Sequence, residues 1–262
     1  MLNQSFKIFE ATRNGNLFLR GNWRYLLKMS LLPLLVHLVS GTFVQLTKSD
    51  ASIFEIYLWN LPSVAAFGWF TFIQTRLIFL GETLHNIPAD SWYRQNRKHS
   101  MQASVIIFIL FNMFFTFATS GMMLLAIADQ ADRVKHSAAG MVTLLVVAAL
   151  FFGIRYAFLY ILAAVNFPLK VFIKQIFHPL ISVQIIAATT MVLLPVIIVF
   201  QILLFMVVPN QEALISGTGL GVSERIMIAA IASLVSLAST SLVNVVLAYA
   251  VKQMIFPVNK EV

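Results

Sequence analysis

Long apolar runs separated by short polar segments dominate the pattern along this chain. Each of six runs holds roughly 20 to 30 residues, enough for a helix to cross about 30 Å of hydrocarbon. The runs cover residues 26–46, 57–80, 101–128, 138–164, 180–208 and 226–255. Apolar residues are consecutive within a run and do not alternate with polar ones, which argues against a transmembrane β-barrel. The pattern predicts an all-α, polytopic membrane protein with about six transmembrane helices in three hairpins.

The composition agrees with this fold class. Hydrophobic side chains make up 60% of the 262 residues and charged ones only 11%, whereas soluble domains carry about 25% charged residues. A soluble enzyme is therefore excluded, and we expect residues 1–262 to form a single transmembrane domain. Cysteine is absent, which excludes disulfides, thiolate nucleophiles and cysteine-ligated metals.

The positive charges predict the orientation of the chain. The formal net charge is +8, and 14 of the 18 Lys and Arg residues fall on one face when each is assigned to the nearer end of its span. The other four are Lys48, Arg133, Lys135 and Arg225. Because cytoplasmic loops carry the excess of Lys and Arg, we expect both termini in the cytoplasm and the chain in a bacterial inner membrane. We expect anionic lipids of the cytoplasmic leaflet, rather than nucleic acid, as partners of this charge.

Three stretches on the predicted inner face are basic and partly apolar. They are residues 3–24, 86–100 and 166–178, and each precedes one predicted hairpin. Such segments are typical of amphipathic helices that lie in the headgroup layer, so residues 1–24 are expected to form a cytoplasmic amphipathic segment. Arg76 and Arg155 are 79 residues apart, as are His99 and His178, which suggests a repeated hairpin unit.

Residues 15–23 read Gly-Asn-Leu-Phe-Leu-Arg-Gly-Asn-Trp. This entry to the first predicted span resembles that of bacterial six-helix inner-membrane proteins related to the membrane domain of some glycerophosphodiester phosphodiesterases. The resemblance rests on this motif and on the six-span layout of the whole chain. It implies a short amphipathic helix before the first span and a recurring hairpin. It carries no catalytic residues across, because the 262 residues contain no phosphodiesterase domain.

Arginines inside apolar runs are the first candidates for a binding site, because burying a charge in a membrane is costly. Arg76 and Arg155 each lie four or five residues from the end of a predicted span. They either hold a lipid phosphate or another anion through paired hydrogen bonds, or extend to the headgroups and anchor their helices. The other candidates for anion binding are basic residues of the inner face: Arg94, Arg97, Lys98, Lys170 and Lys174.

Two further ionisable residues, Glu82 and His37, have both a functional and a purely structural interpretation. Glu82 follows Arg76 by six residues and could pair with it, but a solvated carboxylate in a loop is the expectation that the sequence favours. His37, in the middle of the first span, could relay protons, but a neutral histidine bonded to a neighbouring helix is the commoner case. The spacing of His85, Asp90 and His99 fits no metal motif, so neither a metal nor a cofactor is expected.

Polar residues at helical spacing mark two predicted spans. The sixth span carries Ser233, Ser236, Thr240 and Asn244 on one face, and the third carries Asn112 and Thr116. These residues either pack helices closely together or line a polar path for a solute. Pro195 is expected to kink the fifth span.

Sequence motifs for hydrolases, nucleotide binding and metal catalysis are missing. We therefore expect a non-enzymatic membrane protein that acts in envelope homeostasis or in a larger assembly and contacts anionic lipid. Its partners would be further copies of itself or other membrane proteins. The alternative is a permease subunit for a small or lipid-like solute. A lipid-modifying enzyme that uses Arg76, Arg155 and Glu82 is the third hypothesis.

Overall fold

The computed structural model describes residues 5–47, 52–131, 136–176, 178–207 and 220–256. All regular elements in these ranges are helical, which confirms the predicted all-α class, while the arrangement in three hairpins stays a prediction. The α-helices are α1 (Ile8–Thr47), α2 (Ile53–Leu80), α3 (Ser91–Ala131), α4 (His136–Gly153), α5 (Ala157–Ala164), α6 (Leu169–Ile176), α7 (Pro179–Val207) and α9 (Val222–Ile255). A 3-10 turn, η1 (Ile154–Tyr156), joins α4 to α5. Six helical segments are long and apolar enough to cross a membrane, and each overlaps one predicted run.

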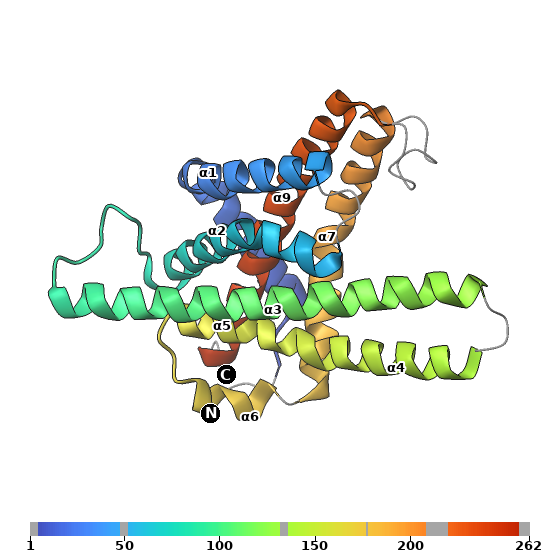
Figure 1. The fold of residues 1–262 in the computed structure, drawn as a ribbon. Coiled ribbons are helices and arrows are strands. Elements are labelled where there is room, and N and C mark those ends of the chain that lie inside the picture. The colour runs from blue at the N-terminus through green and yellow to red at the C-terminus, as the bar shows by residue number, and fades with distance from the viewer. Residues whose placement is uncertain (1–4, 48–51, 132–135, 177, 208–219, 257–262) are drawn as a thin grey trace.

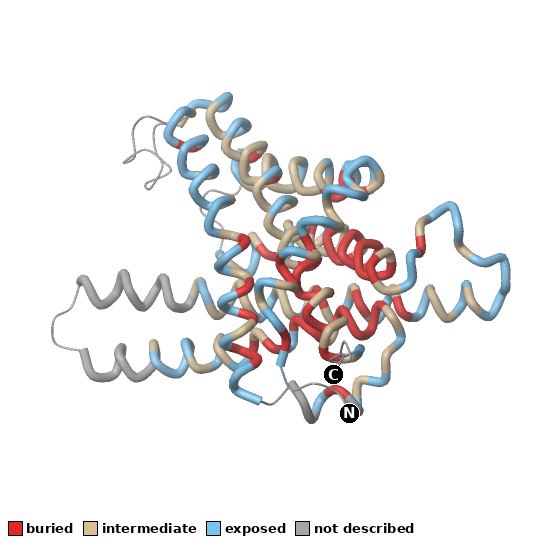
Figure 2. The backbone as a smooth tube through the Cα atoms, turned by 180° about the vertical axis from the view of Figure 1, so that it is seen from behind, coloured by how far each residue is buried: buried red, intermediate tan, exposed pale blue. Residues whose placement is uncertain are grey.

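Helix α9 connects the other helices of the bundle. It packs against α1, α2, α5 and α7, and α3 packs against α2, α4 and α5. Figure 1 shows α9 running obliquely through the bundle beside α7, with α3 and α4 forming a long pair. Buried residues gather in the middle of the molecule, whereas the outer part of the α7 and α9 pair is largely exposed (Figure 2). The main core therefore lies where α1, α5, α7 and α9 approach one another.

The N-terminal segment differs from the expected separate amphipathic helix. It is continuous with the first span in α1, and Ala11 is fully buried. A Cβ at Gly15 would lie 3.2 Å from Val246 Cγ2, so the small residue lets α1 approach α9 closely. The side chain of Gln184 donates to the Phe6 carbonyl at 2.9 Å. Residues 6–15 are thus part of the packed core because tertiary contacts with α7 and α9 bury one side of them.

The other two basic stretches are also helical. Residues 91–100 form the first turns of α3, and residues 169–176 form α6. Phe172 of α6 is fully buried, with its ring centroid 6.2 Å from that of Phe158, while Lys170 is exposed. Both stretches therefore have one side against the bundle; their position in a headgroup layer stays a prediction.

The fourth predicted run is interrupted, which its apolar pattern did not indicate. Helix α4 ends at Gly153, and the 3-10 turn η1 places Arg155 between α4 and α5. A Cβ at position 153 would overlap the Phe114 ring of α3. Glycine therefore permits the close approach of α4 to α3 just before the interruption.

Candidate functional site

Four side chains, two of them buried and two half-buried, form a polar cluster where α2 ends and α3 begins. This Glu82 cluster consists of Arg76, Glu82, Tyr93 and Arg97. Arg76 donates from Nε to Glu82 Oε2 at 2.7 Å and from Nη2 to the Tyr93 hydroxyl at 2.8 Å. The Tyr93 hydroxyl donates to Glu82 Oε2 at 2.6 Å, and Arg97 donates to Glu82 Oε1. Glu82 is thus bound by three donors.

The backbone at the end of α2 brings these residues together. Gly81 has φ 63° and ends α2 in the left-handed region, which glycine adopts without steric cost. The turn returns Glu82 toward Arg76, six positions earlier. Arg76 also donates from Nη1 to the Ala164 carbonyl of α5 at 2.9 Å. The cluster therefore joins α2, α3 and α5 at one end of the bundle.

The expectation of a solvated carboxylate at position 82 is wrong. Glu82 is 6% exposed and Arg76 is 4% exposed. Burial raises the pKa of the Glu82 carboxyl, but the hydrogen bonds from Arg76, Tyr93 and Arg97 lower it, and the net pKa lies below its ordinary value. Glu82 is therefore ionised at neutral pH and neutralises guanidinium charge inside the protein.

Arg155, the second intramembrane candidate, lies in a different environment from Arg76. It is 3% exposed, and its Nε donates to the Ser182 hydroxyl of α7. Its guanidinium group lies 4.8 Å from the Phe152 ring centroid, a cation-π distance. Arg155 thus connects η1 to α7, and the structure does not bring it together with Arg76 in one cluster.

The remaining basic candidates divide by exposure. Arg97 binds Glu82, whereas Arg94, Lys98 and Lys170 are exposed. The side chain of Lys174 lies outside the described residues. Exposed cations are the ones that can reach an external anion, since Arg76 and Arg97 already contact a carboxylate.

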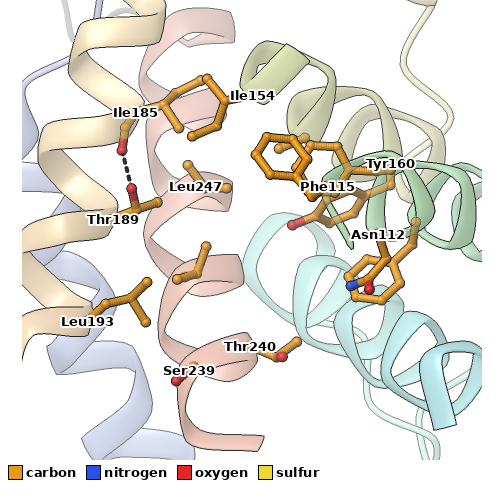
Figure 3. Close-up of a pocket in the computed structure, with 14 residues that line it drawn as sticks. Asn112, Phe115, Ile154, Tyr160, Ile185, Thr189, Leu193, Ser239, Thr240 and Leu247 are labelled. Carbon is orange, nitrogen blue, oxygen red and sulfur yellow. Dashed lines mark hydrogen bonds between the residues drawn. The ribbon is translucent and has the colours of Figure 1, made fainter. Parts of the chain in front are cut away.

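A second polar feature is a pocket between α3, α5, α7 and α9, here called the interhelical pocket (Figure 3). It has a volume of about 300 Å³. Phe108, Phe111, Phe115 and Tyr160 form an aromatic wall, and Asn112, Thr189, Ser239 and Thr240 supply polar groups. Two predicted polar-path residues, Asn112 and Thr240, therefore lie in the same pocket. Tyr160 and Ser239 also line the pocket, and no sequence pattern singled them out.

The other polar candidates either bond to groups within the bundle or lie outside the interhelical pocket. Asn244 donates to Gln74 Oε1 at 3.0 Å, and Ser233 donates to the Ala229 carbonyl at 2.7 Å. His37 Nδ1 lies 2.6 Å from the Ser63 hydroxyl of α2, the helix-to-helix contact that the sequence favoured. Ser236 and Thr116 do not line the interhelical pocket. Pro195 lies inside α7, beside Leu234 and Val235 of α9.

Gln74 and Asn244 form a buried amide pair whose removal should cost stability. Gln74 also donates to Ser241 at 2.5 Å, and both amides are at most 1% exposed. Asn244→Leu would leave the Gln74 carbonyl without its donor, and we expect a loss of about 1–3 kcal/mol in the free energy of unfolding. SDS titration from mixed micelles measures it. The double variant Gln74→Leu/Asn244→Leu should recover part of the loss, because neither amide then remains unpaired. Equal stability of wild type and Asn244→Leu would contradict this assignment.

A metal centre finds no support in the part of the chain that the structure describes. No group of three or more His, Asp or Glu residues there could hold an ion. The chain matches no family model, no curated protein and no solved structure. The proposal of a function therefore depends on the exposed cations, the Glu82 cluster and the interhelical pocket.

Proposed function

We propose that this multi-pass membrane protein is a non-enzymatic component of a bacterial inner membrane that binds anionic lipid at its cytoplasmic face. The observation that supports this proposal is the division of the basic residues by exposure. Arg94, Lys98 and Lys170 are exposed, whereas the guanidinium groups of Arg76 and Arg97 are already bound to Glu82. Only the first group is available to lipid phosphates.

Exposed tryptophans beside basic residues support the same proposal. Trp92, on the first turn of α3, is 68% exposed, and Trp23 of α1 is 55% exposed. Arg24 lies 5.4 Å from the Trp23 ring centroid. Exposed tryptophans next to basic residues are typical of the membrane–water interface. They would hold the basic side chains at headgroup depth.

Native mass spectrometry of the protein from mild detergent tests this proposal. We expect wild type to retain phosphatidylglycerol in preference to phosphatidylcholine. The variant Arg94→Gln/Lys98→Gln should lose about tenfold to thirtyfold of this affinity, because each basic residue near an anionic surface contributes about 1 kcal/mol.

The matched control removes two charges from the predicted outer face. Lys48→Gln/Lys135→Gln should retain anionic lipid like wild type. Equal losses in both variants would show a dependence on net charge alone and would overturn the proposed site. Retention of both lipids at the same level by wild type would do the same.

A permease subunit for a small or lipid-like solute is the second candidate function. The interhelical pocket favours it, because the pocket places Asn112 and Thr240 together inside apolar surroundings. Flux of a solute into proteoliposomes, sensitive to pocket variants but not to Arg94→Gln/Lys98→Gln, would support this candidate over the first.

A further inference from the structure

The wall of the interhelical pocket is mostly aromatic and aliphatic. Phe108 and Tyr160 meet edge to face with ring centroids 5.3 Å apart, and Phe111 lies 6.2 Å from Tyr160. Leu193 and Leu247 face them from α7 and α9 (Figure 3). A wall of this kind binds the apolar part of a small molecule through area burial and ring contacts.

Four polar side chains interrupt this wall without a hydrogen-bond partner among the described residues: Asn112, Tyr160, Ser239 and Thr240. The Tyr160 side chain is the most informative, because the residue is 3% exposed and its hydroxyl points into the pocket (Figure 3). Two other hydroxyls of this bundle have partners within their own helices. Thr189 donates to the Ile185 carbonyl at 2.8 Å, and Ser233 donates within α9.

These groups face the pocket and are free to bond a molecule that enters it. Transfer of a polar group from water to an apolar solvent, where it has no hydrogen-bond partner, costs several kcal/mol, and a membrane-spanning bundle is a comparable environment. Asn112 and Tyr160 come from α3 and α5, and Ser239 and Thr240 come from α9, so hydrogen-bonding groups line the pocket from three helices. A bound molecule with polar groups of its own would find partners on more than one side of the pocket.

The charge of the lining decides the chemical class. All the residues that line the pocket are uncharged. A phosphate or carboxylate would find no counter-ion there, whereas a hydroxyl or carbonyl group would find amide and hydroxyl partners. The volume, about 300 Å³, is at the lower end for small-molecule sites, so a single chain or ring fits better than a whole two-chain lipid.

We infer that the interhelical pocket binds an uncharged amphiphile, an apolar chain or ring that carries hydroxyl or carbonyl groups. This inference does not rest on the proposed anionic-lipid site. Two sources share the chemistry: a neutral glycerolipid offers hydroxyls, and an isoprenoid quinone offers ring carbonyls.

Photo-crosslinking of the purified protein in phosphatidylcholine nanodiscs tests the inference. The three probes are a photoreactive monoacylglycerol, a photoreactive isoprenoid quinone and a photoreactive phosphatidylglycerol. We expect one of the neutral probes to label peptides that contain residues 108–115 or 239–247, and the one that labels them identifies the source. Phosphatidylglycerol should not label these peptides.

Two conservative substitutions provide the sharpest variant. Tyr160→Phe/Thr240→Val removes two hydroxyl oxygens and little else, and we expect labelling by the neutral probe to fall at least about fivefold. Thr119→Val is the matched control, because Thr119 does not line the pocket and its hydroxyl bonds the Phe115 carbonyl of its own helix. A filling substitution, Val243→Trp, should abolish labelling, with folding checked by size-exclusion elution.

Three results would overturn the inference. One is equal labelling of the pocket peptides by all three probes, which indicates surrounding bilayer lipid only. Another is unchanged labelling in Tyr160→Phe/Thr240→Val. The third is the absence of pocket labelling by either neutral probe. None of these results bears on the anionic-lipid site, whose test depends on Arg94 and Lys98.

Discussion

Glu82→Gln is expected to destabilise the protein by about 3–5 kcal/mol. Removing the carboxylate leaves the guanidinium groups of Arg76 and Arg97 without their counter-ion, and the Arg76 side chain is only 5% exposed. Loss of one partner from a buried ion pair costs this much because the other charge stays in a medium of low polarity. The free energy of unfolding, from SDS titration in mixed micelles, measures the effect.

Removal of the positive partner, Arg76, distinguishes the cost of an unpaired buried charge from the cost of a lost contact. Arg76→Met should cost less than Glu82→Gln, since Glu82 keeps its bonds from Arg97 and Tyr93. Glu10→Gln is the control, because the Lys7–Glu10 pair is 3.6 Å long and largely exposed, and it should change stability by less than about 1 kcal/mol. A larger loss in Arg76→Met than in Glu82→Gln would show that the arginine's other contacts dominate the cluster.

The Glu82 cluster changes the interpretation of Arg76. From the sequence, Arg76 was a candidate either for anion binding or for anchoring in the headgroups. In the structure its Nε, Nη1 and Nη2 atoms donate to Glu82, Ala164 and Tyr93 in turn. Its role is therefore to join three helices at one end of the bundle. In the proposed function, anionic lipid is therefore bound by other cations, and its test depends on Arg94 and Lys98.

The number and approximate positions of the helices that can span a membrane could be predicted because they depend on a local property, the length of an apolar run. The Arg76–Glu82 pair was a recognised alternative because only six residues separate the two, but the rest of the Glu82 cluster could not be predicted. Tyr93 and Arg97 lie 11 and 15 residues beyond Glu82, and 88 residues separate Arg76 from Ala164. Only the folded chain brings them together. Gln74 was visible as a polar residue inside a predicted span, and that signal could have indicated a buried partner. Tyr160 gave no such signal, because an apolar run readily includes tyrosine.

The interruption at Ile154–Tyr156 and the continuity of α1 were also inaccessible to pattern analysis. Both depend on packing between distant helices: Gly153 against Phe114, and Gly15 against Val246. The composition of residues 3–24 is amphipathic in either case. A basic segment with apolar residues can lie on a bilayer or pack on a bundle, and only the presence of a fitting helix surface decides between them.

Phe158→Ala is expected to destabilise the protein by about 3–5 kcal/mol. Its local effect tests whether the N-terminal segment and α6 are held by packing against α5. Phe158 is fully buried, and its ring lies 6.3 Å from Phe6 and 6.2 Å from Phe172. Truncation opens a cavity beneath both segments. Hydrogen exchange should therefore rise in residues 6–20 and 169–173 before it rises in the middle of α3.

The control for this prediction is Phe9, a phenylalanine in the N-terminal segment that Phe158 contacts through Phe6. Phe9 is 77% exposed, so Phe9→Ala should leave both stability and exchange close to wild type. If Phe158→Ala raised exchange uniformly over the bundle, the N-terminal segment and α6 would unfold only with the whole protein. If it raised exchange nowhere, these segments would not depend on α5, and the basic stretches would be surface helices as their composition alone suggests. A rise confined to them shows that one aromatic side chain on α5, through its contacts with Phe6 and Phe172, holds two of the basic segments against the core.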